Sequence, residues 1–303
     1  MGHPEPSTTV IASGKETRSI HPHRFGGRLI PFTKAHACGN DFLIVTEEAA
    51  ADYDRVNLTR RLCDRHTGIG ADGIEFFAWT GPKSGRIRLH NADGSIAEIS
   101  GNGTRCAAAW MALERGFQPG DEVEIATDAG PRVCRVNALK TDGEFTAEVT
   151  AGMGVPSFAP RAVKLGNGLR VAGVEVSTGN PHFVIVVDNA EFTVASLTWQ
   201  QIGAEICVHA DFPHQTNVEF LRIISPTEIE IRIFERGVGP TTSSGTGSSA
   251  SATAALALNG CRSPLAVVAP GGAQTVEWDG PGTELRLTGP ASLIAHGEAW
   301  AHQ

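Results

Sequence analysis

Two serines, Ser100 and Ser244, each open a segment of the form S-G-x-G that runs into an alanine-rich stretch. Serine is a preferred N-cap residue, so the pattern predicts a helix beginning at each. Glycine lowers helix propensity, but it lets a ligand approach the free N–H groups, where the helix dipole favours an anion. Two such helix starts facing each other across a cleft would hold a carboxylate and present one side chain to each face of the adjacent carbon.

Such an arrangement suits the inversion of a carbon next to a carboxylate. This reaction needs a base on one face, an acid on the other, and stabilisation of an enolate-like intermediate. The N–H groups of the helix starts would stabilise the intermediate. For either serine taken singly, helix capping alone is the simpler interpretation, and the repetition of the motif favours a site.

The serines belong to a longer internal repeat. Its first copy contains "GNDFLIV" from Gly39, "GIEFF" from Gly73 and "SGNGTRCAAAW" from Ser100, and its second contains "GNPHFVIVV" from Gly179, "NVEFL" from Asn217 and "SGTGSSASATAA" from Ser244. The second motif precedes the third by 27 residues in both copies. A polar residue at a predicted strand end, Asn91 or Glu235, stands nine residues before each serine. Two copies are too few for a solenoid, so the repeat predicts two similar α/β domains with a cleft between them.

The elements that must position these motifs follow an α+β pattern. From Pro31 onward, short β-branched runs alternate with turn residues and a few alanine-rich helical segments. We expect a flexible N-terminal extension over residues 1–30, a first half over 31–150 and a second half over 151–303. About the last ten residues are expected to pack back on the first half.

Composition excludes several classes of protein. The 303-residue chain has a net charge of -8 and scattered basic residues, which argues against a nucleic-acid partner. No run approaches the roughly 18 apolar residues of a membrane span, and residues 1–30 lack the apolar stretch of a secretory signal. Six cysteines without paired spacing favour reduced thiols and a cytoplasmic protein.

Six short motifs of the chain resemble those of a known protein family. "GNDF", "NADGS", "GNGTRC", "GNPHFV", "NVEF" and "ERGVG...SGTGS" occur in the order and spacing of the diaminopimelate epimerases, from Phe32 to the C-terminal region. The resemblance implies two pseudo-symmetric domains, each a mainly antiparallel sheet wrapped around a central helix. It also implies epimerisation of LL-diaminopimelate to meso-diaminopimelate without cofactor or metal, in lysine and peptidoglycan precursor synthesis, and a homodimer in some members.

The resemblance assigns roles to particular residues. The family's ligand-holding set, which grips the amino and carboxylate groups of the distal stereocentre, corresponds to Asn40, Asn91, Asn180, Asn217, Glu235 and Arg236. The helix starts that would receive the carboxylate at the reacting centre correspond to Gly101, Asn102, Gly245 and Thr246. His182 would support the site without transferring a proton. Each asparagine alone fits ordinary turn and cap chemistry, and their joint spacing favours a substrate site.

The sequence departs from the family where the chemistry is expected. The two catalytic cysteines of the family correspond to Ser100 and Ser244, and a hydroxyl is far harder to ionise than a thiol. Cys106 cannot replace Ser100, since six helical residues correspond to a rotation of roughly 240° and more than one turn of rise. Gly73 stands where the family usually has glutamine, and Pro240 where it has glutamate.

These departures leave three functions open. The chain is an epimerase of the diaminopimelate type whose activity is weak or redirected, an isomerase of the same fold for another amino acid or small carboxylate, or an amino-acid binder without catalysis. Gly73 motivates the second, and the loss of both thiols motivates the third. Whether the two serines are native or engineered is equally open at this stage.

Overall fold

The computed structural model describes residues 28–301. Its helices are α1 (Arg55–Cys63), α2 (Gly101–Arg115), α3 (Trp199–Cys207) and α4 (Gly245–Leu258). The strands of the first half are β1 (Arg28–Ala37), β2 (Asn40–Thr46), β3 (Gly73–Gly81), β4 (Ser84–Asn91), β5 (Ile96–Ala97), β6 (Glu122–Thr127), β7 (Gly130–Lys140) and β8 (Phe145–Gly152). Those that follow are β9 (Ser157–Lys164), β10 (Arg170–Ser177), β11 (Pro181–Val187), β12 (Asn217–Ser225), β13 (Glu228–Glu235), β14 (Gly239–Thr241), β15 (Leu265–Ala269), β16 (Gly272–Glu277) and β17 (Arg286–Ala301).

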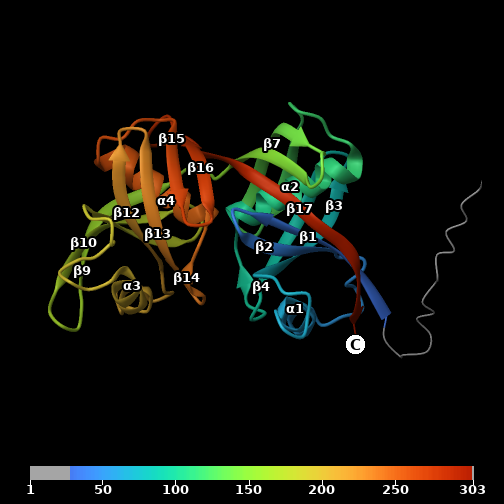
Figure 1. Cartoon of the computed structure of the whole chain (residues 1–303), viewed down its shortest axis with the longest axis horizontal. Coiled ribbons are helices and arrows are strands. Elements are labelled where there is room, and N and C mark those ends of the chain that lie inside the picture. The colour runs from blue at the N-terminus through green and yellow to red at the C-terminus, as the bar shows by residue number, and fades with distance from the viewer. Residues whose placement is uncertain (1–27, 302–303) are drawn as a thin grey trace, which may run out of the picture.

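The two halves repeat one order of elements. The series from β1 to β8, with α1 and α2, recurs as the series from β10 to β17, with α3 and α4. Each half has two parallel pairs at corresponding places, β2 with β3 and β4 with β6, then β11 with β12 and β13 with β15. All other pairs of named strands are antiparallel. Figure 1 shows the two bodies side by side, which confirms the predicted α+β fold with duplicated halves.

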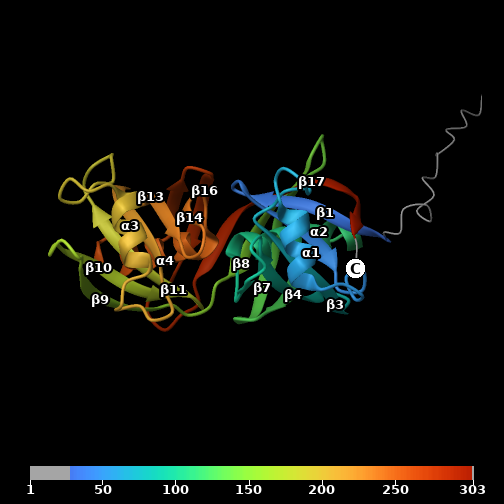
Figure 2. The ribbon, with the colours of Figure 1, turned by 90° about the horizontal axis from the view of Figure 1, so that it is seen from below.

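A central helix fills each half. Twelve residues of α2 and eleven of α4 are buried, and both helices belong to one hydrophobic core that spans the two halves. In α4 the buried hydroxyls of Ser249 and Thr253 donate to the backbone oxygens of Gly245 and Ser249, four residues earlier. These bonds satisfy polar groups inside a helix that is surrounded by protein. The shorter helices α1 and α3 cover smaller clusters on the same side of the molecule (Figure 2).

The last strand joins the halves. β17 pairs with β16, then with β8, and finally runs antiparallel to β1, where Arg28 lies opposite Ala301. Figure 1 shows it crossing from the second half over the first. This pairing corrects one expectation, because β1 begins at Arg28, inside the segment expected to be a flexible extension. The remainder of that expectation, residues 1–27, lies outside the described residues.

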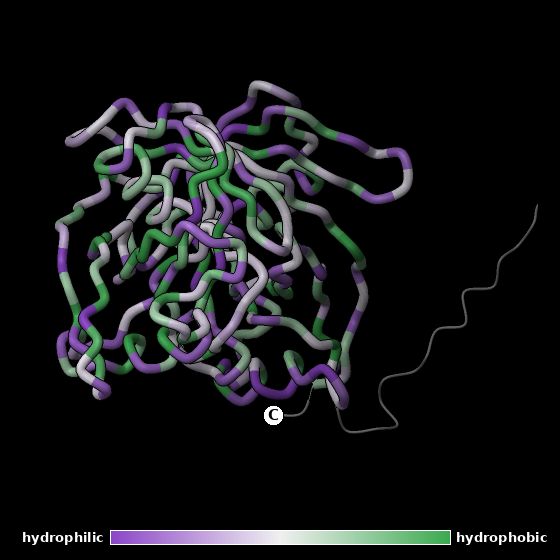
Figure 3. Tube along the Cα trace, turned by 60° about the vertical axis from the view of Figure 1, so that its left-hand side comes forward, coloured by the Kyte–Doolittle hydropathy of each residue, from purple (hydrophilic) through white to green (hydrophobic). Residues whose placement is uncertain are grey.

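The surface follows the usual pattern of half-buried sheets. Along the outer strands, hydrophilic and hydrophobic residues alternate in the trace (Figure 3), as expected where one face of a strand packs on the core and the other meets water. Within residues 28–301, none of the helices combines the length and apolar character that a membrane crossing requires.

Candidate active site

The N-terminal ends of α2 and α4 meet backbone to backbone. A methyl group added to Gly245 would lie 2.7 Å from Gly101 Cα and 2.8 Å from Asn102 N. One added to Gly101 would lie 3.1 Å from Gly245 Cα. Only glycine permits so close an approach of two backbones. The first glycine of each S-G-x-G motif therefore brings the two helix starts to one place.

Ser100 and Ser244 are the N-caps of these helices, as the sequence predicts. Ser100 Oγ accepts a hydrogen bond of 3.0 Å from Gly103 N, and Ser244 Oγ accepts one of 3.1 Å from Gly247 N. Each cap bond uses a lone pair of the hydroxyl oxygen. The hydroxyl proton of each serine can therefore go to another acceptor, and for Ser244 the hydroxyl of Thr246 lies 3.3 Å away.

A cavity of about 640 Å³ adjoins the two serines. Its volume lies in the range of small-molecule sites. Among the residues singled out from the sequence, those that line it are Asn40, Asn91, Ser100, Asn180, Asn217, Glu235, Arg236, Ser244 and Thr246. Gly101, Asn102, Gly245 and His182 are not among its lining residues, and Asn102 and His182 are fully buried. Both halves thus contribute side chains to one polar cavity.

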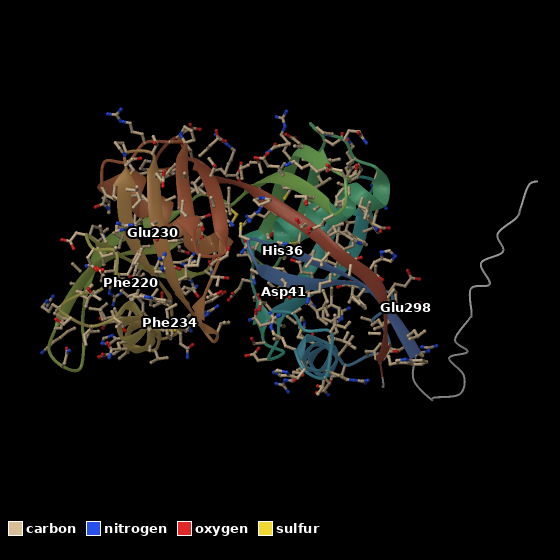
Figure 4. The ribbon with its side chains drawn as sticks, in the orientation of Figure 1. His36, Asp41, Phe220, Glu230, Phe234 and Glu298 are labelled. Atoms are coloured by element: carbon tan, nitrogen blue, oxygen red, sulfur yellow. The ribbon has the colours of Figure 1, made fainter. Side chains whose placement is uncertain are left out.

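The lining asparagines are held by neighbours from their own half. Asn40 Nδ2 donates to Asp72 Oδ2 over 2.6 Å, and Arg65 pairs with both Asp72 and Asp41. Figure 4 labels Asp41 in the first half. Hydrogen bonds also hold three others, Asn91 to Ser95, Asn180 to Thr246 and Asn217 to the backbone of Pro181 and Arg236. These contacts orient the amides before any ligand binds.

Asn102 joins the halves beneath the cavity. Its four side-chain partners are Asn40 Oδ1 at 3.2 Å, Ser243 Oγ at 3.1 Å, Gln274 Nε2 at 2.9 Å and Arg105 Nη2 at 2.7 Å. Arg105 is itself fully buried. The Asn102 side chain is therefore committed to structure, which leaves the backbone N–H groups of the helix start to meet a ligand.

We expect Asn102→Ala to lower the free energy of unfolding by about 2–3 kcal/mol, because the change leaves buried partners, one of them charged, without their hydrogen bonds. Urea denaturation would measure the loss. Asn137→Ala is the matched control, since Asn137 is exposed and its side chain bonds Thr150 alone among residues 28–301. Equal stability of the two variants would contradict the joining role of Asn102.

Glu235 and Arg236 are adjacent charged residues that line the cavity, whose lining also includes Asp72, Asp93 and Glu98. Burial, followed by the nearby carboxylates of Asp72 and Glu219, raises the pKa of Glu235 to about 7. Arg236 Nη2 pairs with Glu98 Oε2 of the first half over 3.2 Å. Because both partners are partly exposed, this ion pair contributes less than about 1 kcal/mol. A ligand carboxylate can therefore replace Glu98 at Arg236 at little cost.

His182 lies behind the lining asparagines. Its Nδ1 is 2.8 Å from Glu219 Oε1 and its Nε2 is 2.9 Å from Asn180 Oδ1. Both His182 and Glu219 are fully buried. Burial raises the pKa of Glu219, and the interaction with His182 opposes that rise. The imidazole therefore links a buried carboxyl to a cavity residue.

Sequence reasoning missed two buried carboxyl groups, those of Glu75 and Glu219. A signal was present, because Glu75 precedes Ser100 and Glu219 precedes Ser244 by the same 25 residues. Neither oxygen of Glu75 has a hydrogen-bond partner within residues 28–301, and burial raises its pKa to about 8. Such a group costs stability and needs an explanation.

Glu75→Gln should stabilise the protein in a pH-dependent way. The pKa of Glu75 is raised from 4.5 to about 8, so between these values the folded protein keeps a proton that the unfolded chain has released. The stability of the parent therefore falls as pH rises through this window. Glutamine cannot ionise, and we expect the variant to match the parent near pH 4 and to exceed it by on the order of 5 kcal/mol above pH 8. Urea denaturation from pH 4 to 9 measures the difference, and a constant difference across that range would refute it.

The structure shows the surroundings of Gly73 and Pro240, the two residues that depart from the family pattern outside the serines. A methyl on Gly73 would lie 2.5 Å from the backbone oxygen of His90, so the usual glutamine has no room beside β4. Pro240 lies on β14 opposite Phe234, which Figure 4 labels on β13.

Cys106 is fully buried and burial raises the pKa of its thiol, so it stays neutral inside α2. All six cysteines are free and buried.

The fold recurs in solved structures of low sequence identity. A phenazine biosynthesis protein of the PhzF family from Bacillus anthracis superposes with a TM-score of 0.66 at 18% identity, over 90% of this chain and 99% of that one. A hydroxyproline epimerase from Agrobacterium vitis gives a TM-score of 0.64 at 16% identity, over 90% and 91% of the two chains. These likenesses show that the fold of this chain recurs in other proteins.

Sequence comparison is more specific. A model of the diaminopimelate epimerase family matches residues 32–159 and 174–294, so the chain belongs to this family and is an isomerase. A relative from Corynebacterium glutamicum, named diaminopimelate epimerase, is 38% identical over 282 residues, covering 89% of this chain and 98% of the relative. One of the same name from Teredinibacter turnerae is 34% identical over 286 residues, covering 88% and 98%.

Proposed function

We propose that this chain epimerises LL-diaminopimelate to meso-diaminopimelate by proton transfer on the two faces of the α-carbon, with Ser100 and Ser244 at the two transfer positions. The observation that carries the proposal is the contact between the two helix starts, which brings both N-cap serines to one cavity lined from both halves. The product serves lysine and peptidoglycan precursor synthesis, as membership of the family implies.

The reacting end of the substrate lies at the helix starts. Its carboxylate accepts hydrogen bonds from free backbone N–H groups in the first turns of α2 and α4, at Gly101, Asn102, Gly245 and Thr246. Removal of the α-proton moves the electron pair toward this carboxylate. The N–H groups and the two helix dipoles stabilise the enolate-like charge that develops there.

The distal end of the substrate lies among the asparagines. Arg236 pairs with the distal carboxylate in place of Glu98, while Glu235 and the oxygens of Asn40, Asn91, Asn180 or Asn217 accept from the distal amino group. His182 acts only by holding Asn180. Recognition of both charged groups fixes which α-carbon meets the serines, and so favours a diamino diacid over a simple amino acid.

Incubation with LL-diaminopimelate in deuterated water tests the proposal. We expect α-deuterium incorporation and meso product from the parent protein, and loss of both from the Ser100→Ala, Ser244→Ala double variant. Ser84→Ala on β4 is the matched control and should keep the parent rate. Calorimetric binding without exchange would instead identify an amino-acid binder, and turnover of other amino acids alone would identify a different isomerase.

The cellular setting is part of the proposal. Six free cysteines suit a reducing compartment, and we place the enzyme in the cytoplasm. The homodimer that the family resemblance implies stays a prediction, which sedimentation of the purified protein would test.

A further inference from the structure

Glu75 lies beneath the first turn of α2. It is on β3, on the strand face that carries Phe77 and meets this helix. A methyl added to Gly103 would lie 2.1 Å from Glu75 Oε1 and 3.3 Å from Ser100 Cβ. The second glycine of the S-G-x-G motif therefore makes room for a carboxyl group close to the N-cap serine.

Glu219 occupies the corresponding place beneath α4. It is on β12, and a methyl added to Gly247 would lie 2.8 Å from Glu219 Oε1 and 3.3 Å from Ser244 Oγ. The same glycine makes room for the same group in both halves. The second glycine of each motif and the glutamate 25 residues before the serine of that motif therefore form the same arrangement in both halves.

The two carboxyl groups differ in their partners. Glu219 shares a hydrogen bond with His182, whereas neither oxygen of Glu75 has such a partner among the described residues. The titratable groups that interact electrostatically with Glu75 are the thiols of Cys106 on α2 and Cys134 on β7. Burial raises the pKa of both thiols. Since these thiols stay neutral, Glu75 can carry a proton at neutral pH or give it up without a competing charge at its side.

We propose that Glu75 and Glu219 are positioning residues that accept or return the proton of the Ser100 and Ser244 hydroxyls. This inference rests on the proposed epimerase function and deepens it. A serine hydroxyl is a weak acid and a weak base, so it needs a partner to transfer protons at neutral pH. The cap bond leaves the hydroxyl proton of Ser100 for such a partner, while Ser244 Oγ also lies 3.3 Å from Thr246 Oγ1. The buried carboxyl beside the same glycine of each motif can meet that need.

The proton transfers balance over one turnover. On one face the α-carbon to hydrogen bond breaks, the proton passes to the serine oxygen, and the proton of that hydroxyl passes to the carboxylate beneath it. On the other face the second serine gives its proton to the α-carbon and takes one from the Glu219 or the Glu75 carboxyl group, according to direction. At the end of the turnover, one carboxyl group has gained a proton and the other has lost one. Proton exchange with solvent restores the starting state. No oxidant or reductant takes part.

Glu75→Gln tests this inference, with Glu124→Gln on the exposed side of β6 as the matched control. We expect Glu75→Gln to lower kcat by about 100-fold or more, the size of a general acid-base contribution, with KM within about twofold of the parent. The pH profile of the parent should change near pH 8, where Glu75 loses its proton. Activity should fall through this pH in the reaction direction in which Glu75 returns a proton and rise in the opposite direction, and this dependence should be absent from the variant. Glu219→Gln should lower kcat in the same direction.

A second variant separates proton transfer from packing. Glu75→Asp keeps a carboxyl group at the cost of one methylene, so we expect a higher kcat than for Glu75→Gln. A packing role predicts the reverse order, because glutamine preserves the volume. Parent-like kcat and pH dependence in Glu75→Gln, or its failure to fold, would overturn the inference while leaving the epimerase function standing. Absence of exchange in the parent would overturn both.

Discussion

Gly245→Ala is expected to lower epimerase activity by at least about 100-fold, the cost of displacing catalytic groups by about 1 Å. The added methyl would meet backbone atoms of Gly101 and Asn102 at 2.7–2.8 Å, and backbone cannot rotate away as a side chain does. The two helix starts must separate, which moves Ser100 and Ser244 apart. Overpacking should also lower the free energy of unfolding by about 1–3 kcal/mol, and assays of kcat with urea denaturation measure both effects.

Gly101→Ala gives the graded comparison. Its methyl would lie 3.1 Å from Gly245 Cα and 3.0 Å from the flexible end of Met153, so a smaller loss is expected. Gly166→Ala is the control, because its methyl would meet only Glu205 Oε1 at an ordinary 3.5 Å. Full activity of Gly245→Ala would show that contact between the helix starts is not required for catalysis.

The Ser100→Cys, Ser244→Cys double variant is expected to raise kcat by about 100-fold, because a thiol with a reference pKa of about 8.5 ionises far more readily than a hydroxyl. The helix dipole lowers the pKa further at both N-caps. The gain should grow with pH while one thiol ionises and fall where both are ionised, because the reaction needs one thiolate and one thiol. Measurement of kcat from pH 6 to 9 checks this.

Each single cysteine variant serves as a control for the double variant. A one-sided thiol leaves a hydroxyl on the other face, so we expect a smaller gain from either single change. The double alanine variant sets the baseline without transfer groups. An activity that is unchanged or lower in the double cysteine variant, with unchanged folding, would contradict the transfer positions assigned to the serines.

Local sequence chemistry predicted the parts of the fold that depend on neighbouring residues. Serine before a glycine-rich turn predicted the N-caps of α2 and α4, and the equal spacing of the repeated motifs predicted the two halves. The start of β1 at Arg28 depends on its pairing with the end of β17, which local patterns do not contain.

The parts of the candidate site that depend on long-range contacts could not be predicted from the sequence. The sequence assigns Asn102 to a helix start that receives a carboxylate, but it gives no sign that the Asn102 side chain bonds partners from both halves. Glu75 sits in an apolar strand whose two faces are both buried, so alternation could not reveal that it faces α2. Glycine is required at position 103 because a methyl group there would collide with the Glu75 carboxyl group, a contact that only the folded structure reveals.

Hydrogen exchange at the α-carbon by the single alanine variants tests most directly whether Ser100 and Ser244 address opposite faces of one bound amino acid. In deuterated water, we expect Ser100→Ala to exchange the α-hydrogen of one stereoisomer of diaminopimelate and Ser244→Ala that of the other, with neither forming the opposite isomer. Exchange of the same stereoisomer by both variants, or continued epimerisation by either, would contradict the two-sided transfer.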